Sequence, residues 1–339
     1  MDRVTVLPRM SEAQAARVAR DLYGVTAVAT RLPAEHDDVF RLVTDGAEAR
    51  FLRVSPAPAA AAPGPSFLTA ILLHLAATAP DLPVQRVIPS RGGEAEVITG
   101  GRLVRMTTFL DGRLLAGVPS SLALRGDIGA TLARLSRALR DFTHPAARRT
   151  HHWDLQNFAQ LRPLLAALPS IEPRTRLLAL LDRFDEQLRP ALAAVPVQVI
   201  HTDFHGENLL VSPDGTAVCG VLDFGDSVTG PVAMDVAVAA CYQLGASPGD
   251  FLAAALDVVA GYHAVDPLRP ADLPLIRDFI ELRLATRIIV SQWNAAAEPA
   301  NSGYLLRRTS QAIEHFAAFS DIPASMVVGR LRAACGFSQ

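Results

Sequence analysis

The sequence predicts an α+β fold with two lobes, a small β-rich N-terminal lobe and a larger, mainly helical C-terminal lobe. Short alternating apolar runs dominate the first hundred residues, whereas apolar residues at helical spacing dominate the remainder. A chain of 339 residues is long enough for two lobes. We place the N-terminal lobe at residues 1–106, a hinge at 107–112 and the C-terminal lobe at 113–339.

The N-terminal lobe is predicted to begin with a helix and a hairpin. Met10–Tyr23 has helical spacing behind Ser11, a residue type that caps helices. Val39–Val43 and Ala49–Val54 alternate around Thr44-Asp45-Gly46, which is typical of a β-hairpin. The pattern then predicts a Pro- and Ala-rich connector, a helix and three strands: Ser55–Ser66, Phe67–Ala77, Val84–Ile88, Glu96–Ile98 and Leu103–Met106.

The C-terminal lobe is predicted to be helical around a small β insert. Its first helix has an apolar face made of Ile128, Leu132, Leu135, Leu139 and Phe142. Further helices are predicted at Leu161–Leu168, at Arg174–Leu192 and from Met234 onward. The insert consists of Val197–Ile200, Leu209–Val211 and Val218–Leu222, the last two joined by the turn Ser212-Pro213-Asp214-Gly215.

Three polar residues of the insert have the chemistry that phosphoryl transfer needs. Asp203 follows a strand, Asn208 comes five residues later, and Asp223 ends the returning strand. Transfer needs a carboxylate that orients the accepting hydroxyl and oxygen ligands that hold Mg²⁺ against the phosphates. A strand–turn–strand hairpin brings all three residues to one edge, the first toward substrate and the others toward metal. The alternative is a loop in which Asp and Asn only cap turns.

The spacing of these residues resembles a known signature. His201-x-Asp203-x4-Asn208, followed by Asp223-Phe224-Gly225, resembles the aminoglycoside phosphotransferase and choline kinase superfamily, which has a protein-kinase-like fold. The resemblance implies that Asp203 is the catalytic base and that Asn208 and Asp223 bind Mg²⁺. It implies that His201 shapes the catalytic loop. Asp235, twelve residues past Asp223, matches an aspartate that braces this loop.

The resemblance extends to one branch of the superfamily. Leu132–Leu135, Phe142–Pro145, Trp153-Asp154 and Leu222–Asp226 resemble hydroxylysine-kinase-like proteins, with homoserine kinases as near neighbours. Members of this branch act on small amino acids or amino alcohols. The resemblance therefore implies a kinase that uses ATP or GTP with Mg²⁺ on an amino-bearing alcohol.

The N-terminal lobe departs from this family pattern. Arg53 stands where a phosphate-binding lysine is expected, and the helix Phe67–Ala77 lacks the acidic partner of that lysine. The whole chain contains no lysine. Arginine binds phosphate through a planar fork and is not freely interchangeable with lysine. Either Arg53 is a working substitute, or the protein binds ligand without turnover.

Two further segments are candidates for nucleotide binding. The loop Leu32–Phe40 occupies the place of the phosphate-covering loop and contains Asp37, although it lacks GxGxxG. An ordinary surface loop is the alternative. Met106–Phe109 occupies the place of the adenine-binding hinge, where Met106 would pack near the base. The alternative for Met106 is a methionine of the core.

The acceptor site is predicted from charged residues near the catalytic loop. Asp226 and Glu207 are candidates for a substrate ammonium, although Asp226 could equally cap a turn. Arg287, which shares a helix face with Arg283 four residues away, is a candidate for a substrate carboxylate. His205 is predicted to shape the loop or contact the substrate.

Bulk properties narrow the classes of partner. The net charge of −2 gives no general attraction to nucleic acid or to an anionic membrane, and no apolar run is long enough to cross a bilayer. Three scattered cysteines indicate reduced thiols and a cytoplasmic protein. An aminoglycoside phosphotransferase is the alternative function. A protein kinase is disfavoured by the short segment between Asp223 and Asp235, and the oligomeric state stays open.

Overall fold

A computed structural model of the chain describes residues 8–34, 37–46, 48–57, 64–168, 173–299 and 302–338. It divides into two compact units, Met1–Asp111 and Gly112–Gln339. The first contains an antiparallel sheet and the second is mainly helical, so the predicted α+β class is confirmed. None of the helices within the described ranges is long and apolar enough to cross a membrane.

The N-terminal unit is built on a sheet in the order β1-β2-β3-β6-β4, with β5 paired to β6. Helix α1 begins behind a capping box, in which the Ser11 hydroxyl accepts from the Gln14 amide and the Gln14 side chain accepts from the Ser11 amide. The elements are α1 (Glu12–Tyr23), β1 (Val28–Leu32), β2 (Asp38–Val43), β3 (Arg50–Pro56), α2 (Phe67–Thr78), β4 (Val87–Ile88), β5 (Val97–Thr99) and β6 (Arg102–Thr108). The predicted helices and the β2–β3 hairpin are confirmed, and β1 is an addition. Most of the predicted connector, residues 58–63, lies outside the described residues.

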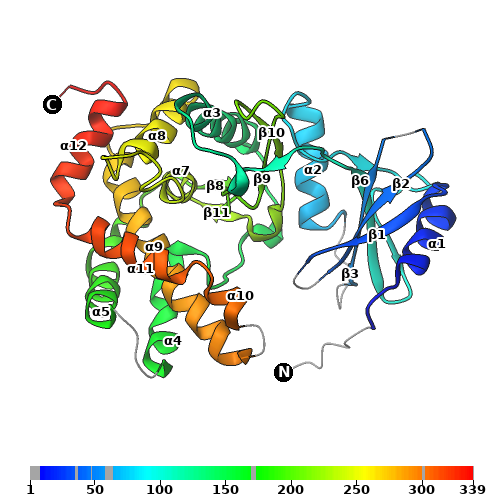
Figure 1. Cartoon of the computed structure of the whole chain (residues 1–339), viewed down its shortest axis with the longest axis horizontal. Helices are drawn as coiled ribbons and strands as arrows, with labels where there is room; N and C mark the ends of the chain where they lie inside the picture. Colours follow the sequence, from blue (N-terminus) through cyan, green and yellow to red (C-terminus); the bar gives the residue numbers. More distant parts are fainter. Residues whose placement is uncertain are drawn as a thin grey trace. The chain divides into compact units, whose positions relative to one another are not determined.

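The two faces of this sheet have different roles. Helices α1 and α2 lie on opposite faces (Figure 1). Apolar strand residues turn toward α1 and form the core of the unit, among them Leu52, Val54, Val104 and Met106. Side chains alternate along a strand, so Arg53 and Arg105, which pair directly across β3 and β6, share the other face. Arg105 there donates to the Thr69 hydroxyl of α2 at 2.8 Å.

The C-terminal unit packs helices around small antiparallel sheets, β10-β9-β7 and β11-β8. Helix α9 is its longest, and it packs against α7 and α11 (Figure 1). Helices α3 and α8 pass so closely that a Cβ on Gly129 would lie 2.0 Å from the Val258 carbonyl oxygen. The remaining elements are β7 (Arg113–Leu114), α3 (Leu122–Leu139), α4 (Arg162–Ala167), α5 (Arg174–Arg183), α6 (Arg189–Leu192), β8 (Gln198–Ile200), β9 (Leu209–Val211), β10 (Val218–Val221), β11 (Val228–Gly230), α7 (Val232–Cys241), α8 (Ala253–Val265), α9 (Asp272–Ala297), α10 (Ser302–Leu306), α11 (Thr309–Ser320) and α12 (Ala324–Ala334).

The predicted β insert is confirmed as an antiparallel β9–β10 hairpin that follows β8. The predicted helix over Arg174–Leu192 is one helical segment interrupted by a π-turn at Phe184–Leu188. Strands β7 and β11 are additions, and they pair with β9 and β8. The candidate catalytic and metal-binding residues of the insert, Asp203, Asn208 and Asp223, therefore lie near the ends of short strands inside a helical unit.

Candidate active site

The loop after β8 is held by the side chain of Asp235 on α7. Its two oxygens accept the backbone amides of His201 at 2.9 Å and Thr202 at 2.8 Å. Burial raises the pKa of Asp235 and outweighs these hydrogen bonds. Thr202 has φ +66°, a conformation that a β-branched residue rarely adopts and that costs about 1–3 kcal/mol. The loop is thus strained and braced where it presents its next residue, Asp203.

His201 joins the two halves of the catalytic hairpin. Its Nδ1 accepts the Asp203 amide at 3.2 Å, so its Nε2 carries the proton and donates to the Leu222 carbonyl at 2.9 Å. The Leu222 amide in turn donates to the Asn208 carbonyl at 2.8 Å. These bonds bring Asp203, Asn208 and Asp223 to one edge, as the sequence predicts.

The Asp203 carboxylate is surrounded by donors. Its Oδ2 accepts from Asn208 Nδ2 at 2.6 Å, and its Oδ1 lies 2.6 Å from Arg283 Nη2 and 3.2 Å from His205 Nε2. Burial alone would raise the pKa of Asp203, but His205 and Arg283 outweigh it and hold the pKa well below its usual range. Asp203 is therefore an anion at neutral pH, oriented through both oxygens.

Asn208 and Asp223 have the donor set that Mg²⁺ prefers. Asn208 Nδ2 is engaged by Asp203, which leaves its amide oxygen for a metal. Asp223 is exposed in a left-handed conformation at φ +52°, where its Oδ1 also accepts the Gly225 amide at 3.0 Å. Within the described ranges, no group of three or more His, Cys, Asp and Glu could hold a metal alone. Phosphate oxygens and water would complete the coordination, as is usual for Mg²⁺.

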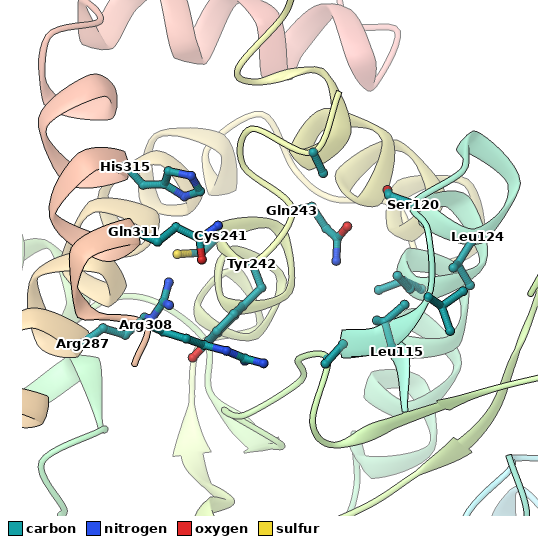
Figure 2. A pocket seen from close by; sticks show the side chains of 15 residues that line it. Leu115, Ser120, Leu124, Cys241, Tyr242, Gln243, Arg287, Arg308, Gln311 and His315 are labelled. Atoms are coloured by element: carbon teal, nitrogen blue, oxygen red, sulfur yellow. The ribbon is translucent and has the colours of Figure 1, made fainter. Parts of the chain in front are cut away.

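Beside the catalytic loop lies a pocket of about 370 Å³. Arg287 and Arg308 line it with Gln311 and His315, whereas Leu115 and Leu124 lie on the opposite side (Figure 2). Gly206 of the catalytic loop also contributes. None of the described residues that line the pocket is Asp or Glu.

Arg287 is the buried cation of this pocket. Its side chain is 8% exposed, and its guanidinium lies 4.6 Å from the centroid of the Tyr242 ring. Across the part of the chain that the structure describes, no carboxylate forms an ion pair with it. Burial, and then the nearby Arg287, lower the pKa of His315. The pocket therefore has a positive field that an anionic group would neutralise.

The two acidic candidates for binding a substrate ammonium, Glu207 and Asp226, have different surroundings. Glu207 pairs with Arg307 at 2.6 Å and with Arg308 at 3.3 Å, so its charge is already balanced. Asp226 is half-buried, and its backbone carbonyl accepts from the Thr202 hydroxyl at 2.8 Å. Burial, and then Asp203, raise the pKa of Asp226. A substrate cation would offset the unfavourable energy of this buried negative charge, so Asp226 is the better of the two candidates for an ammonium.

In the N-terminal unit, Arg53 forms an ion pair with Asp37. Its neighbour Arg105 is 7% exposed, and burial, followed by the charge of Arg53, lowers the pKa of Arg105 to about 10. The acidic side chain at the start of α2 comes from Glu96, which accepts hydrogen bonds from the Ser66 and Thr69 hydroxyls. Of the predicted nucleotide loop, residues 35 and 36 lie outside the described residues.

Met106 is fully buried in the core against α1, on the opposite sheet face from Arg53. The structure therefore favours the alternative of a core methionine. Sequence reasoning missed Arg283 and Tyr242, which contact the catalytic loop from α9 and from the end of α7. The helical spacing of Arg283 and Arg287 was the available signal, but it did not reveal which of them reaches Asp203.

Comparison with known proteins identifies the family. The family model described as "Phosphotransferase enzyme family", APH, matches residues 28–275. The chain belongs to the APH phosphotransferase family. It is 25% identical to hydroxylysine kinase of Danio rerio over 325 residues, which cover 91% of each chain.

Solved structures place this phosphotransferase among kinases of the same fold. An amicoumacin kinase in complex with AMP-PNP, Ca²⁺ and Ami aligns with a TM-score of 0.70 at 17% identity, covering 94% of this chain and 98% of that one. A microcompartment-associated aminopropanol kinase aligns with a TM-score of 0.60 at 21% identity, covering 95% and 98%. This APH-family phosphotransferase thus has the fold of small-molecule kinases.

Proposed function

We propose that this phosphotransferase moves the γ-phosphate of ATP or GTP, with Mg²⁺, onto the hydroxyl of a small amino-bearing alcohol. Hydroxylysine- or homoserine-like amino acids are the first candidates. The observation that carries this choice is Arg287, a buried guanidinium in a pocket whose described lining residues include no Asp or Glu. A guanidinium fork binds a carboxylate through two parallel hydrogen bonds.

The catalytic residues have distinct proposed roles. Asp203 accepts the hydrogen bond of the acceptor hydroxyl and aims its oxygen at the phosphorus. Because donors keep Asp203 anionic, it takes the proton only as the new P–O bond forms. Asn208 and Asp223 would hold Mg²⁺, which neutralises the charge of the phosphates when bound. Arg53, on the sheet face opposite α1, would contact the phosphates in place of a lysine.

Acceptor recognition divides between the two kinds of charge. Arg287 would bind the substrate carboxylate, with Arg308 and Gln311 at the same wall of the pocket (Figure 2). Asp226 would bind the ammonium, because a cation there offsets the cost of its buried charge. Glu207 is paired with arginines and is left out of this scheme.

Two alternatives have specific support. Antibiotic phosphotransfer is supported by fold neighbours, but a cationic sugar would meet Arg287 in a pocket whose described lining residues include no acid, and Glu207 nearby is paired with Arg307 and Arg308. Binding without turnover was motivated by Arg53. The oriented Asp203 beside Asn208 favours turnover, and Asp37 gives Arg53 an acidic partner.

The test is nucleotide turnover with pairs of acceptors that differ only by a carboxylate. Homoserine and 3-aminopropan-1-ol are such a pair. We expect wild type to favour the carboxylate acceptor in kcat/KM by about 10- to 100-fold, the size of a charge-assisted hydrogen bond. Arg287→Met should remove most of this preference, and Asp203→Ala should abolish turnover. Equal kcat/KM for both acceptors in wild type would contradict the carboxylate assignment.

A further inference from the structure

Arg283 is a buried guanidinium in contact with the catalytic carboxylate. Its side chain is 2% exposed on α9, eighty residues from Asp203. Its Nη2 donates to Asp203 Oδ1 at 2.6 Å and to the Tyr242 hydroxyl at 3.1 Å. The guanidinium also lies 4.9 Å from the centroid of the Trp153 ring. Arg283 is thereby fixed between one carboxylate and two aromatic rings.

Tyr242 contacts both groups that lie next to Asp203 Oδ1, Arg283 and His205. Its aromatic ring stacks on His205, with centroids 4.5 Å apart and planes 27° apart. His205 Nε2 in turn lies 3.2 Å from the same Oδ1 that Arg283 contacts. The orientation of Oδ1 therefore depends on two groups that are both held by Tyr242, while Asn208 fixes the other oxygen.

Tyr242 is also a wall of the acceptor pocket. It lines the pocket beside Arg287, whose guanidinium lies 4.6 Å from the Tyr242 ring centroid (Figure 2). The guanidinium of Arg283 also lies near this ring, 5.5 Å from its centroid. A single side chain thus joins the residue proposed to bind the substrate carboxylate to the residue that holds Asp203.

The placement of Arg283 is costly, which indicates a role beyond packing. Its Nε and Nη1 are buried without a hydrogen-bond partner among the described residues. Unpaired buried donors are rare in folded proteins and lower stability. The fold accepts this cost at a position where the remaining nitrogen serves Asp203 and Tyr242 together.

We propose that Arg283 is a positioning residue, which holds the Asp203 carboxylate at the angle that the acceptor hydroxyl requires and couples it through Tyr242 to the acceptor pocket. The inference rests on the proposed role of Asp203. Arg283 Nη2 and His205 Nε2 both contact Oδ1, whereas Oδ2 accepts from Asn208 Nδ2 and keeps a second lone pair for the hydroxyl hydrogen. Arg283 touches neither nucleotide nor acceptor in this scheme, and its effect passes through Asp203.

The test compares Arg283→Met, Arg283→Lys and Tyr242→Phe with a matched control on the same helix. Arg277 is suited to this, because it is 5% exposed on α9 and pairs with Glu281 at 2.6 Å, away from Asp203. For each variant, kcat, KM for ATP, KM for the acceptor and the melting temperature are measured.

We expect Arg283→Met to lower kcat about 100-fold, the effect of misplacing a reacting group by about 1 Å, with KM for ATP nearly unchanged. Arg283→Lys keeps the charge but loses the fork, so it should recover only part of kcat. Tyr242→Phe should lower kcat less than Arg283→Met and should raise KM for the acceptor. Arg277→Met should lower the melting temperature and leave kcat of the folded fraction unchanged.

The outcomes separate this inference from the proposed function. Absence of acceptor-dependent turnover in wild type would overturn the function itself. Turnover in wild type, with an equal kcat in folded Arg283→Met, would overturn only the role of Arg283. If Arg283→Met does not fold, wild-type kcat in both Arg283→Lys and Tyr242→Phe would overturn it equally.

Discussion

The β9–β10 hairpin of the C-terminal unit and the sheet of the N-terminal unit differ in how closely they follow the pattern that the family resemblance predicts. The hairpin keeps the expected residue types, with Asp203 hydrogen-bonded to Asn208 at 2.6 Å. On the sheet, Arg53 lies where the resemblance predicts a lysine, and it pairs with Asp37 of the β1–β2 loop rather than with a glutamate of α2.

The difference reflects what each kind of chemistry tolerates. A metal ligand must be a hard oxygen at a fixed distance, and the acceptor hydroxyl needs a carboxylate in one orientation. A phosphate contact needs a cation within reach, and a guanidinium or an ammonium can both supply it. The proposed roles therefore predict that a change of residue type is less damaging at Arg53 than at Asp223.

The largest expected effect comes from the hairpin, where a metal ligand should not tolerate substitution. Asp223→Ala removes the proposed anionic ligand of Mg²⁺, so we expect kcat to fall by about 10³-fold, equivalent to about 4 kcal/mol of transition-state stabilisation. Steady-state turnover at several Mg²⁺ concentrations measures it, with Asp214→Ala in the exposed β9–β10 turn as the control. Activity at the wild-type level in Asp223→Ala would break the comparison.

The second prediction concerns the side that should tolerate change. Arg53→Met should raise KM for ATP by about 10- to 100-fold through the loss of a charge-assisted contact. Arg53→Lys should stay within a few-fold of wild type, because the ammonium replaces the guanidinium. Arg102→Met is the control, since Arg102 lies on the same sheet but pairs with Asp38. Unchanged KM in Arg53→Met would show that Arg53 does not contact the nucleotide.

What the sequence predicted follows the range of the interactions involved. His201, Asp203, Asn208 and Asp223 lie within one hairpin, so their spacing and the turn signal sufficed to bring them together. Arg283 reaches Asp203 from a helix eighty residues later. Helical periodicity indicated a shared face for Arg283 and Arg287 but not the partner of that face.

The N-terminal unit shows the same limit. The sequence shows that α2 contains no acid, but it does not show which acidic residues lie near Arg53 and Arg105 in the fold. Glu96, just before β5, accepts from Thr69, which in turn accepts from Arg105. Similarly, Met106 turned toward α1 because strand alternation sets Arg105 and Met106 on opposite faces. Pairing register decides such outcomes, and the sequence alone left that register open.

The third prediction concerns Asp235, whose side chain holds the loop after β8. Asp235→Asn replaces one carboxylate oxygen with an amide that cannot accept from the loop, so one of the two backbone amides at 201 and 202 loses its partner. We expect a loss of about 1–3 kcal/mol in the free energy of unfolding, together with a lower kcat. Urea unfolding followed by tryptophan fluorescence measures it, because Trp153 and Trp293 both lie in the C-terminal unit. An unchanged unfolding curve would show that Asp235 does not brace the loop.

The smallest expected effect is a difference in pH dependence between Asp38 and Asp235. Burial alone would raise the pKa of Asp38, but hydrogen bonds from Arg31, from the Met10 amide and from Arg9 outweigh it and lower the pKa. Its stabilising contribution is present above the ordinary aspartate pKa of about 3.9 and is lost as pH falls through the lowered folded value.

Asp235 has the opposite sign. Its folded pKa is raised by burial, so its contribution weakens as pH rises from about 3.9 through the folded value. Compared with wild type, Asp38→Asn should cost most stability at neutral pH and progressively less below about pH 4. Asp235→Asn should show the reverse trend across the mildly acidic range. Circular dichroism reports both units and tryptophan fluorescence only the second, so urea unfolding at a series of pH values with both probes assigns each slope to its unit. If the stability loss changed with pH in the same direction for both variants, the opposite pKa shifts of Asp38 and Asp235 would be contradicted.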